Sequence, residues 1–260
     1  MEDNAISADG IPISFETRGD GAPALVFVHG WSCDRTYWRH QLGHFADRYQ
    51  VVAIDLPGHG KSGDGRRTWT MPAFGRDVVA VAERLGLRRM VLIGHSMGGD
   101  VIVEAAGHLR GRVAVLVWVD VYRTLGEPRS QDEVERLAAP FRADFVSATR
   151  AFARQMFLPT SDENLANWVV DDMSAAPPNI ALSALEHAVS FEPAVVRALP
   201  GLGTPVVAIN PDPTPRDVQA LERHGIKTVV MSGVGHFAMM EDPSTFNRLL
   251  TETVEKFAAT

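Results

Sequence analysis

The feature that most constrains this chain is a series of short, nearly continuous apolar runs that end in Gly, Asp or His. They cover residues 24–30, 50–60, 90–99 and 113–120, and two more follow at 204–210 and 226–233. Such runs, rich in β-branched residues, predict strands that are buried on both faces, as in a parallel sheet. Helical patterns lie between them, for example over residues 71–85. Alternating strands and helices predict an α/β fold.

The two ends of the chain carry further local signals. Residues 5–19 alternate apolar and polar side chains on both sides of Asp9-Gly10, which predicts two antiparallel edge strands joined by a hairpin turn. Near the other end, Asp242 is followed by Pro243, a pairing that predicts the N-cap and first residue of a final helix over residues 243–257.

Residues 121–199 interrupt the alternation, because they contain helical patterns and no strand-like run. We therefore expect a core domain made of residues 1–120 and 200–260, with residues 121–199 inserted as a helical cap, here called the lid. Its large apolar side chains could pack only on one another, but as a group they predict a pocket lining. They are Phe141, Phe145, Phe152, Met156, Phe157, Trp168 and Met173.

Composition excludes several classes of protein. A chain of 260 residues that is 45% hydrophobic can bury a core without disulfides or metals, and its single Cys33 is expected to be a small buried packing residue. A net charge of −7 gives no cationic cluster for nucleic acid. No apolar run spans a membrane, and the acidic N-terminus is unlike a signal peptide. We expect a cytoplasmic protein without a cofactor, a metal ion or a membrane partner.

The sharpest motif is Gly-His-Ser-Met-Gly-Gly at residues 94–99, between an apolar strand and a helix. This context predicts a nucleophile elbow with Ser96 at the strained turn. Gly94 and Gly98 supply the small positions that strand and helix need in order to approach. The N–H group of Met97 is then expected to form half of an oxyanion hole.

An earlier motif, His29-Gly30-Trp31, follows another predicted strand. The N–H group of Trp31 is the expected second oxyanion donor, and its ring is expected to wall the substrate pocket. His29 itself is expected to bond to neighbouring backbone rather than to act as a base.

A serine needs a base, and nine histidines compete for that role. His236 is the best placed, because it follows the last predicted strand and precedes the last helix, at the sheet edge where Ser96 lies. We expect structural roles for the other histidines considered, namely His40, His44, His59, His108, His187 and His224.

Two aspartates are candidates for the carboxylate that fixes the tautomer of the His236 imidazole. Asp120 ends the predicted strand 113–120, and Asp212 lies in the loop after the next core strand. Both positions are at the carboxyl edge of the sheet.

Four motifs together resemble the α/β-hydrolase superfamily, in particular its lid-bearing serine esterases, lactonases and C–C hydrolases. They are HGW (29–31), DLPGHGKS (55–62), GHSMGG (94–99) and GVGHFAMMEDP (233–243), and the likeness covers nearly the whole chain. The resemblance implies the α/β-hydrolase fold: an eight-stranded, mostly parallel sheet with helices on both faces and a helical cap after the sixth strand. It also implies a catalytic order of Ser, acid and His.

The chain departs from the family pattern after the seventh strand, where NPDPTP (210–215) places Thr214 in the position of the usual acid. Either Asp212 substitutes from a shifted loop, or the acid lies at the end of the sixth strand. We favour Asp120, with Asp217 as a third choice.

The resulting hypothesis is a cofactor-independent serine hydrolase that cleaves a hydrophobic carboxylic ester or lactone through an acyl-enzyme on Ser96. Alternatives are C–C bond hydrolysis of a diketone, for which Arg123, Arg142, Arg150 and Arg154 could bind a diacid, and a cofactor-free peroxidase reaction. A slow-turnover ligand receptor on the same fold is a further alternative.

Overall fold

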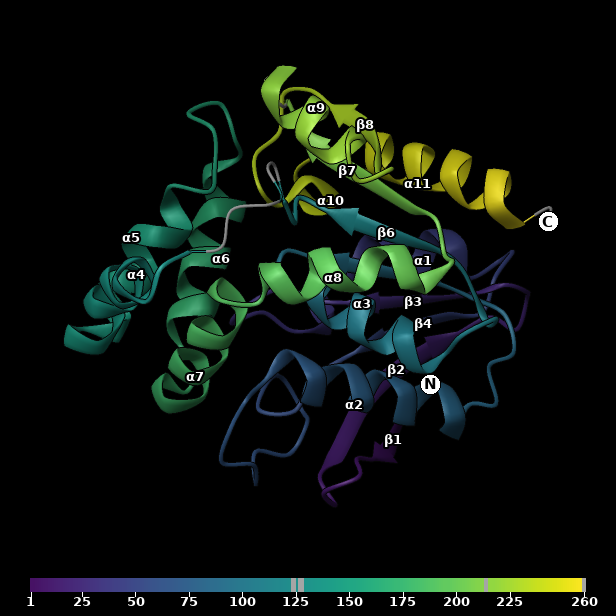
Figure 1. The fold of residues 1–260 in the computed structure, drawn as a ribbon, viewed down its shortest axis with the longest axis horizontal. Coiled ribbons are helices and arrows are strands. Elements are labelled where there is room, and N and C mark those ends of the chain that lie inside the picture. Colours follow the sequence, from purple (N-terminus) through teal and green to yellow (C-terminus); the bar gives the residue numbers. More distant parts are fainter. Residues whose placement is uncertain (123–124, 126–128, 213–214, 259–260) are drawn as a thin grey trace.

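The computed structural model describes residues 1–122, 125, 129–212 and 215–258, which form an eight-stranded sheet with helices on both faces (Figure 1). The strand order is β1-β2-β4-β3-β5-β6-β7-β8. β1 pairs with β2, and β2 with β4, in antiparallel fashion, whereas all later pairs are parallel. The strands are β1 (Glu2–Ile6), β2 (Pro12–Arg18), β3 (Ala24–Val28), β4 (Val51–Ile54), β5 (Met90–His95), β6 (Val113–Val119), β7 (Val206–Pro211) and β8 (Lys227–Met231).

The strand pattern confirms the predicted α/β-hydrolase sheet, with one difference in the first hairpin. The turn at Asp9-Gly10 forms, with Gly10 at φ 84°, a value that suits glycine. Of the two hairpin strands, however, β1 alone lies at an edge of the sheet, because β2 also pairs with β4. The central strands β3, β4 and β5 are buried at every position, which explains their continuous apolar sequence.

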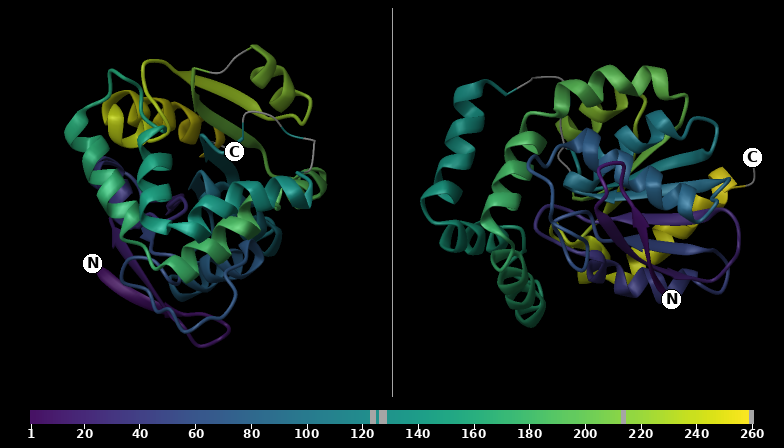
Figure 2. Two further views of the ribbon diagram at one scale, coloured as in Figure 1. Left: turned by 90° about the vertical axis from the view of Figure 1, so that its left-hand side faces the viewer. Right: turned by 90° about the horizontal axis from the view of Figure 1, so that it is seen from below.

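Helices cover both faces of the sheet (Figures 1 and 2). α2 (Met71–Arg84), α3 (Met97–His108) and α8 (Glu192–Leu202) pack together on one face, and α1 (Arg39–Phe45) and α11 (Pro243–Ala258) pack on the other. α2 buries the apolar stripe that its sequence predicts, and Thr70 caps it by accepting from the N–H of Ala73. Asp242 caps α11 as predicted, because its side chain accepts from the N–H of Thr245.

The segment between β6 and β7 contains α4 (Gln131–Ala143), α5 (Phe145–Arg154), α6 (Glu163–Ser174), α7 (Pro178–Val189) and then α8. α4 to α7 stand beside the sheet as a separate layer (Figure 2). α8 crosses the expected boundary at residue 199 and packs against α3 of the core. The division into a core of residues 1–120 and 200–260 and a lid of residues 121–199 stays a prediction.

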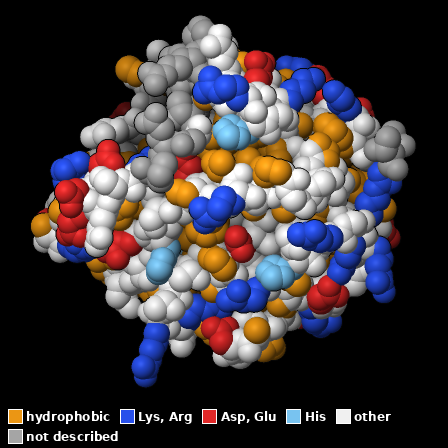
Figure 3. Space-filling model, in the orientation of Figure 1, with side chains coloured by type: hydrophobic (Ala, Val, Ile, Leu, Met, Phe, Trp, Pro, Cys, Tyr) orange, Lys and Arg blue, Asp and Glu red, His pale blue; other side chains and the backbone are white. Residues whose placement is uncertain are grey.

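The remaining helices are short: the 3₁₀ helix η1 (Arg35–Trp38), α9 (Pro215–Glu222) and α10 (Ala238–Glu241). Within the part of the chain that the structure describes, no helix combines the length and the apolar character needed to cross a membrane. On the face drawn in Figure 3, acidic and basic side chains are intermingled.

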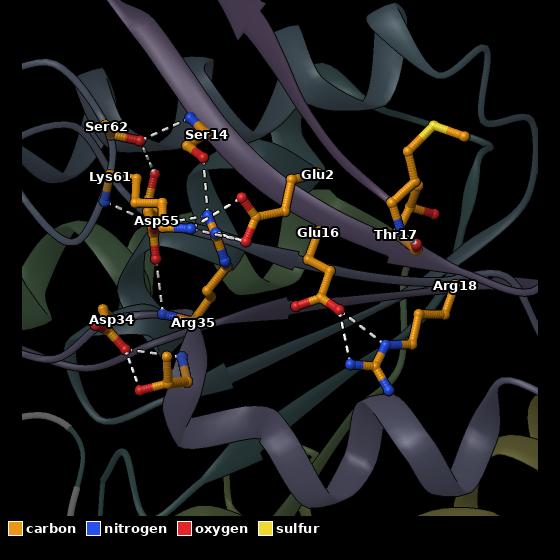
Figure 4. Close-up of polar contacts among 12 residues, drawn as sticks. Glu2, Ser14, Glu16, Thr17, Arg18, Asp34, Arg35, Asp55, Lys61 and Ser62 are labelled. Carbon is orange, nitrogen blue, oxygen red and sulfur yellow. Dashed lines mark hydrogen bonds and ion pairs between the residues drawn. The ribbon is translucent and has the colours of Figure 1, made fainter.

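The DLPGHGKS motif forms a buried junction that holds the loops after β3 and β4 together (Figure 4). The Asp55 carboxylate accepts hydrogen bonds of 2.8 Å from the backbone N–H and the guanidinium of Arg35, and one of 2.9 Å from the N–H of Lys61. A Cβ atom on Gly60 would come within 2.4 Å of this carboxyl group. The motif therefore has a structural role, since it positions the loop that carries Trp31.

Candidate functional site

Ser96 occupies the tight turn that joins β5 to α3. Its backbone angles, φ 51° and ψ −123°, lie in a region that L-residues avoid at a cost of about 1–3 kcal/mol. The N–H of Ser96 donates to the carbonyl of Val119 at the end of β6, at 3.0 Å. The surrounding strands therefore hold the serine in a conformation that its own backbone disfavours.

The glycines on either side of Ser96 are required by close backbone contacts. A Cβ atom on Gly94 would lie 2.3 Å from the carbonyl oxygen of Gly98. One on Gly98 would lie 2.5 Å from the carbonyl oxygen of Val28. Both distances are far below van der Waals contact, so the elbow forms only with glycine at these positions, as the sequence predicts.

His236 lies in the loop between β8 and α10, and its Nδ1 atom is 2.8 Å from Oδ2 of Asp120. Asp120 directly follows β6 and has an unusual φ of 45°, while its N–H donates to the carbonyl of Ile209. Asp212 instead accepts from the hydroxyl of Ser232 at 2.5 Å and from the N–H of Gly233 at 3.4 Å. The structure thus brings Asp120, and not Asp212, to the imidazole. Thr214 and the side chain of Asp217 lie outside the described residues.

A cavity of about 320 Å³ lies between the sheet edge and the lid, and both Ser96 and His236 line it. Trp31 and Met97, the expected oxyanion donors, line the same cavity. Met97 is the first residue of α3, where helical N–H groups lack an acceptor within the helix. The cavity therefore gathers, at the carboxyl ends of β3, β5 and β8, the residues that the sequence singles out.

The lid contributes apolar walls to this cavity, but not with every aromatic residue expected. Phe152, Met156 and Met173 line it, together with α7 residues Leu185, Ala188 and Val189. Phe141 and Phe145 pack edge-on against the Trp31 ring, with centroids 5.4 and 6.1 Å away. Phe157 stacks on Phe237, and Trp168 covers Tyr37.

Trp31 connects the core to the lid. Its indole Nε1–H donates to the carbonyl of Ala181 in α7 at 2.7 Å. Its ring also lies 6.0 Å from Phe152 of α5. Together with the contact to Phe141 of α4, this single residue lines the cavity beside Ser96 and contacts three lid helices.

The other histidines near the site are buried and hydrogen-bonded to backbone. His29 bonds the carbonyl of Gly30 through Nδ1 at 2.8 Å and accepts the N–H of Leu56 through Nε2 at 3.0 Å, and burial lowers its pKa to about 4. Burial likewise lowers the pKa of His59 to about 3. Burial raises the pKa of the Cys33 thiol well above its usual range. None of the three is suited to be a base or a nucleophile at neutral pH.

Two residues that sequence reasoning missed hold the His236 loop. Oε1 of Glu241 accepts from the N–H groups of Gly235 and Phe237, at 3.0 and 3.2 Å, while its Oε2 accepts from Ser161 of the lid at 2.6 Å. His95 donates from Nε2 to the carbonyl of His236 at 3.0 Å. The motif GVGHFAMMEDP contains Glu241, so a carboxylate five residues after the histidine was the available signal.

A further buried carboxyl group, Asp100 in the first turn of α3, lines the cavity and accepts a 2.5 Å hydrogen bond from the hydroxyl of Tyr122. Burial raises the pKa of Asp100 to about 7. The sequence did not predict this pair, because an aspartate is common in the first turn of a helix and needs no partner there.

The arginines considered for a diacid substrate lie elsewhere. Arg142, Arg150 and Arg154 are about half-exposed and pair with lid carboxylates. Arg123 lies outside the described residues, and Arg129 lines the cavity instead. Among residues 1–122, 125, 129–212 and 215–258, no three His, Cys, Asp or Glu side chains are grouped so that they could hold a metal ion.

Comparison with known proteins gives partial and full-length matches. The chain is 37% identical to a non-heme haloperoxidase of Rhodococcus erythropolis over 44% of this chain and 42% of that protein. The first curated relatives are matched over only 26–42% of their own length. The 3-oxoadipate enol-lactonase 2 of Acinetobacter baylyi is 24% identical over 98% of this chain and 97% of its own.

Among solved structures, a thermophilic esterase from Thermogutta terrifontis superposes with a TM-score of 0.85 at 24% identity and covers 99% of both chains. This likeness concerns the fold. A sequence model of the alpha/beta hydrolase family matches residues 25–249, which include the elbow, Asp120 and His236. The strand order, the elbow and this match agree, and the chain belongs to the alpha/beta hydrolase family.

Proposed function

We propose that this chain is a serine hydrolase that cleaves a carboxylic ester or a lactone with a hydrophobic portion. The observation that carries the proposal is the 2.8 Å contact of His236 Nδ1 with Asp120, beside a cavity that also holds the strained Ser96. Because Asp120 accepts the proton on Nδ1, the other ring nitrogen of His236 carries a free lone pair and can act as a base.

In the first half of the reaction, the hydroxyl oxygen of Ser96 attacks the acyl carbon while Nε2 of His236 takes its proton. The N–H groups of Trp31 and Met97 donate to the oxyanion that forms. Collapse breaks the bond to the leaving alcohol, which receives the proton from His236. The product is an acyl-enzyme on Ser96.

In the second half, water attacks the acyl-enzyme and gives its proton to His236. The tetrahedral intermediate then expels Ser96, which regains that proton, and the acid is released. With a lactone, the leaving alcohol stays attached to the acyl group, so that one hydroxy acid is released.

The cavity supports a substrate of modest size with apolar parts. Its volume of about 320 Å³ is at the lower end of ordinary ligand sites. Phe152, Met156, Met173 and Leu185 give it apolar walls. Arg142, Arg150 and Arg154 pair with lid carboxylates, which leaves Arg129 as the arginine among the described lining residues. Because a dianionic diketone calls for several cations, this arrangement favours an ester or a lactone.

The test is the hydrolysis of p-nitrophenyl esters of rising acyl length by the wild type and by Ser96→Ala. We expect a rate that peaks at one chain length and falls by several orders of magnitude in the variant, without loss of folding. The exposed Ser244→Ala is the matched control and should keep the wild-type rate. An unchanged rate in Ser96→Ala would remove the elbow from the mechanism. Binding of esters without turnover would favour a ligand receptor.

The local likeness to the Rhodococcus haloperoxidase supports a second candidate. For this candidate we propose that hydrogen peroxide replaces water as the attacking group on the Ser96 acyl-enzyme, so that a peroxy acid leaves instead of the acid. Adding hydrogen peroxide to the same assay tests it, because peroxy acid should then form at the expense of acid in a Ser96-dependent way.

A further inference from the structure

Asp100 is placed to meet the substrate. It is the fourth residue of α3, the helix that begins directly after Ser96. Its side chain lines the same cavity as Ser96, although the residue is only 4% exposed. A group bound to Asp100 would therefore lie in the same cavity as the acyl carbon that Ser96 attacks.

Within the part of the chain that the structure describes, one oxygen of Asp100 has a hydrogen-bond partner. Oδ1 accepts from the Tyr122 hydroxyl at 2.5 Å, and no other described residue donates to the carboxyl group. Tyr122 is itself fixed, because its ring packs edge-on against Trp118 with centroids 5.4 Å apart and its carbonyl accepts from the side chain of Asn210. Because Asp100 lines the cavity, its other carboxyl oxygen can take a hydrogen bond from a bound substrate.

The surroundings of Asp100 set its charge. Burial is the main influence and raises its pKa to about 7, Tyr122 and Arg129 act in the opposite direction, and Glu192 and Glu104 act with burial. Near neutral pH the carboxyl group therefore exists in both forms. A hydroxyl group suits both, because it can donate to the carboxylate and accept from the neutral acid.

We propose that Asp100 and Tyr122 form a polar subsite that binds an uncharged hydroxyl group of the substrate, close to the scissile ester. The proposal rests on the proposed function and narrows it to esters or lactones that carry such a hydroxyl group beside their apolar part. The apolar walls from the lid hold the rest of the molecule.

The test compares methyl 3-hydroxybutanoate with methyl 3-methylbutanoate, which differ by a hydroxyl in place of a methyl group. Binding is measured by ligand-observed NMR on Ser96→Ala, which should bind without turnover. We expect the hydroxy ester to bind about tenfold more tightly, as one hydrogen bond to a buried partner allows. Adding Asp100→Leu should abolish this preference, whereas adding Asp100→Asn should keep it, because a carboxamide also donates and accepts.

Two further variants make the result decisive. Asp100→Ala replaces Asp100→Leu if the larger side chain prevents folding. Glu104→Gln, one turn further along α3, removes a nearby charge but no group of the cavity lining. It is the matched control and should leave the preference unchanged, because both forms of Asp100 can bond a hydroxyl group. Equal binding of the two esters, no binding of either, or a preference that survives Asp100→Leu would overturn the subsite. Failure of the proposed function is distinguishable, because the binding preference would persist while the wild type hydrolysed neither ester.

Discussion

Replacing Asp120 by asparagine is the sharpest test of the proposed chemistry. Oδ2 of Asp120 lies 2.8 Å from Nδ1 of His236 and accepts its proton. Asparagine has nearly the same shape, but its NH₂ group can face Nδ1 as a donor. The imidazole then carries its proton on Nε2, toward Ser96, and cannot act as a base. Loss of the correct tautomer lowers kcat by about four orders of magnitude in a serine protease, or about 5 kcal/mol of transition-state stabilisation.

The assay is the rate of p-nitrophenyl ester hydrolysis, with the acyl length that the wild type prefers. The matched control is Asp212→Asn, because Asp212 is an exposed carboxylate that bonds Ser232 and Gly233 in the loop before His236. We expect a rate near that of the wild type for the control and a loss of about four orders of magnitude for Asp120→Asn. Equal, small losses in both variants would refute the assignment, and a large loss in Asp212→Asn alone would reverse it. Thermal melting checks that both variants fold.

Three other predictions follow from particular contacts. Burial raises the pKa of Asp100 from its usual 3.8 to about 7 in the folded protein, so Asp100 makes folding less favourable as the pH rises from about 4 to 7. In chemical denaturation, Asp100→Asn should therefore have the same free energy of unfolding as the wild type at pH 4, and a free energy of unfolding higher by up to about 4 kcal/mol at pH 8. A constant difference would contradict the burial of this group. Glu241→Gln should lower kcat about tenfold or more with little change in KM, because it weakens the bonds on both sides of His236, and an unchanged kcat would show that the loop holds itself. Gly98→Val should prevent soluble expression, since its Cβ would lie 2.5 Å from a carbonyl oxygen; a folded, active variant would contradict the steric argument.

Much of the fold follows from local sequence. Buried strands need continuous apolar runs and amphipathic helices need apolar residues three or four apart, so the strands of the parallel part of the sheet and α2 could be read from periodicity alone. The elbow is equally local, because its steric demand on Gly94 and Gly98 acts over a few residues. The cap of α11 by Asp242 needs only the adjacent turn.

Contacts between distant segments were decided by the tertiary structure. Asp120 and Asp212 both follow strands that end at the same sheet edge, so the sequence favoured Asp120 without excluding Asp212. The choice depends on the direction in which each side chain leaves its loop: Asp120, at φ 45°, turns toward His236, whereas Asp212 bonds the loop after β8. The place of β2 between β1 and β4 is likewise a matter of long-range pairing.

The polar contacts in and around the cavity likewise depend on long-range packing. Asp100 meets Tyr122 only because the chain after β6 passes over the first turn of α3, and Glu241 reaches Ser161 only because the lid folds back over the His236 loop. The apolar periodicity of a helix or strand predicts which of its side chains are buried, because the pattern lies within that one element. Periodicity does not predict which buried polar groups contact one another, because those contacts depend on how elements far apart in the sequence pack together.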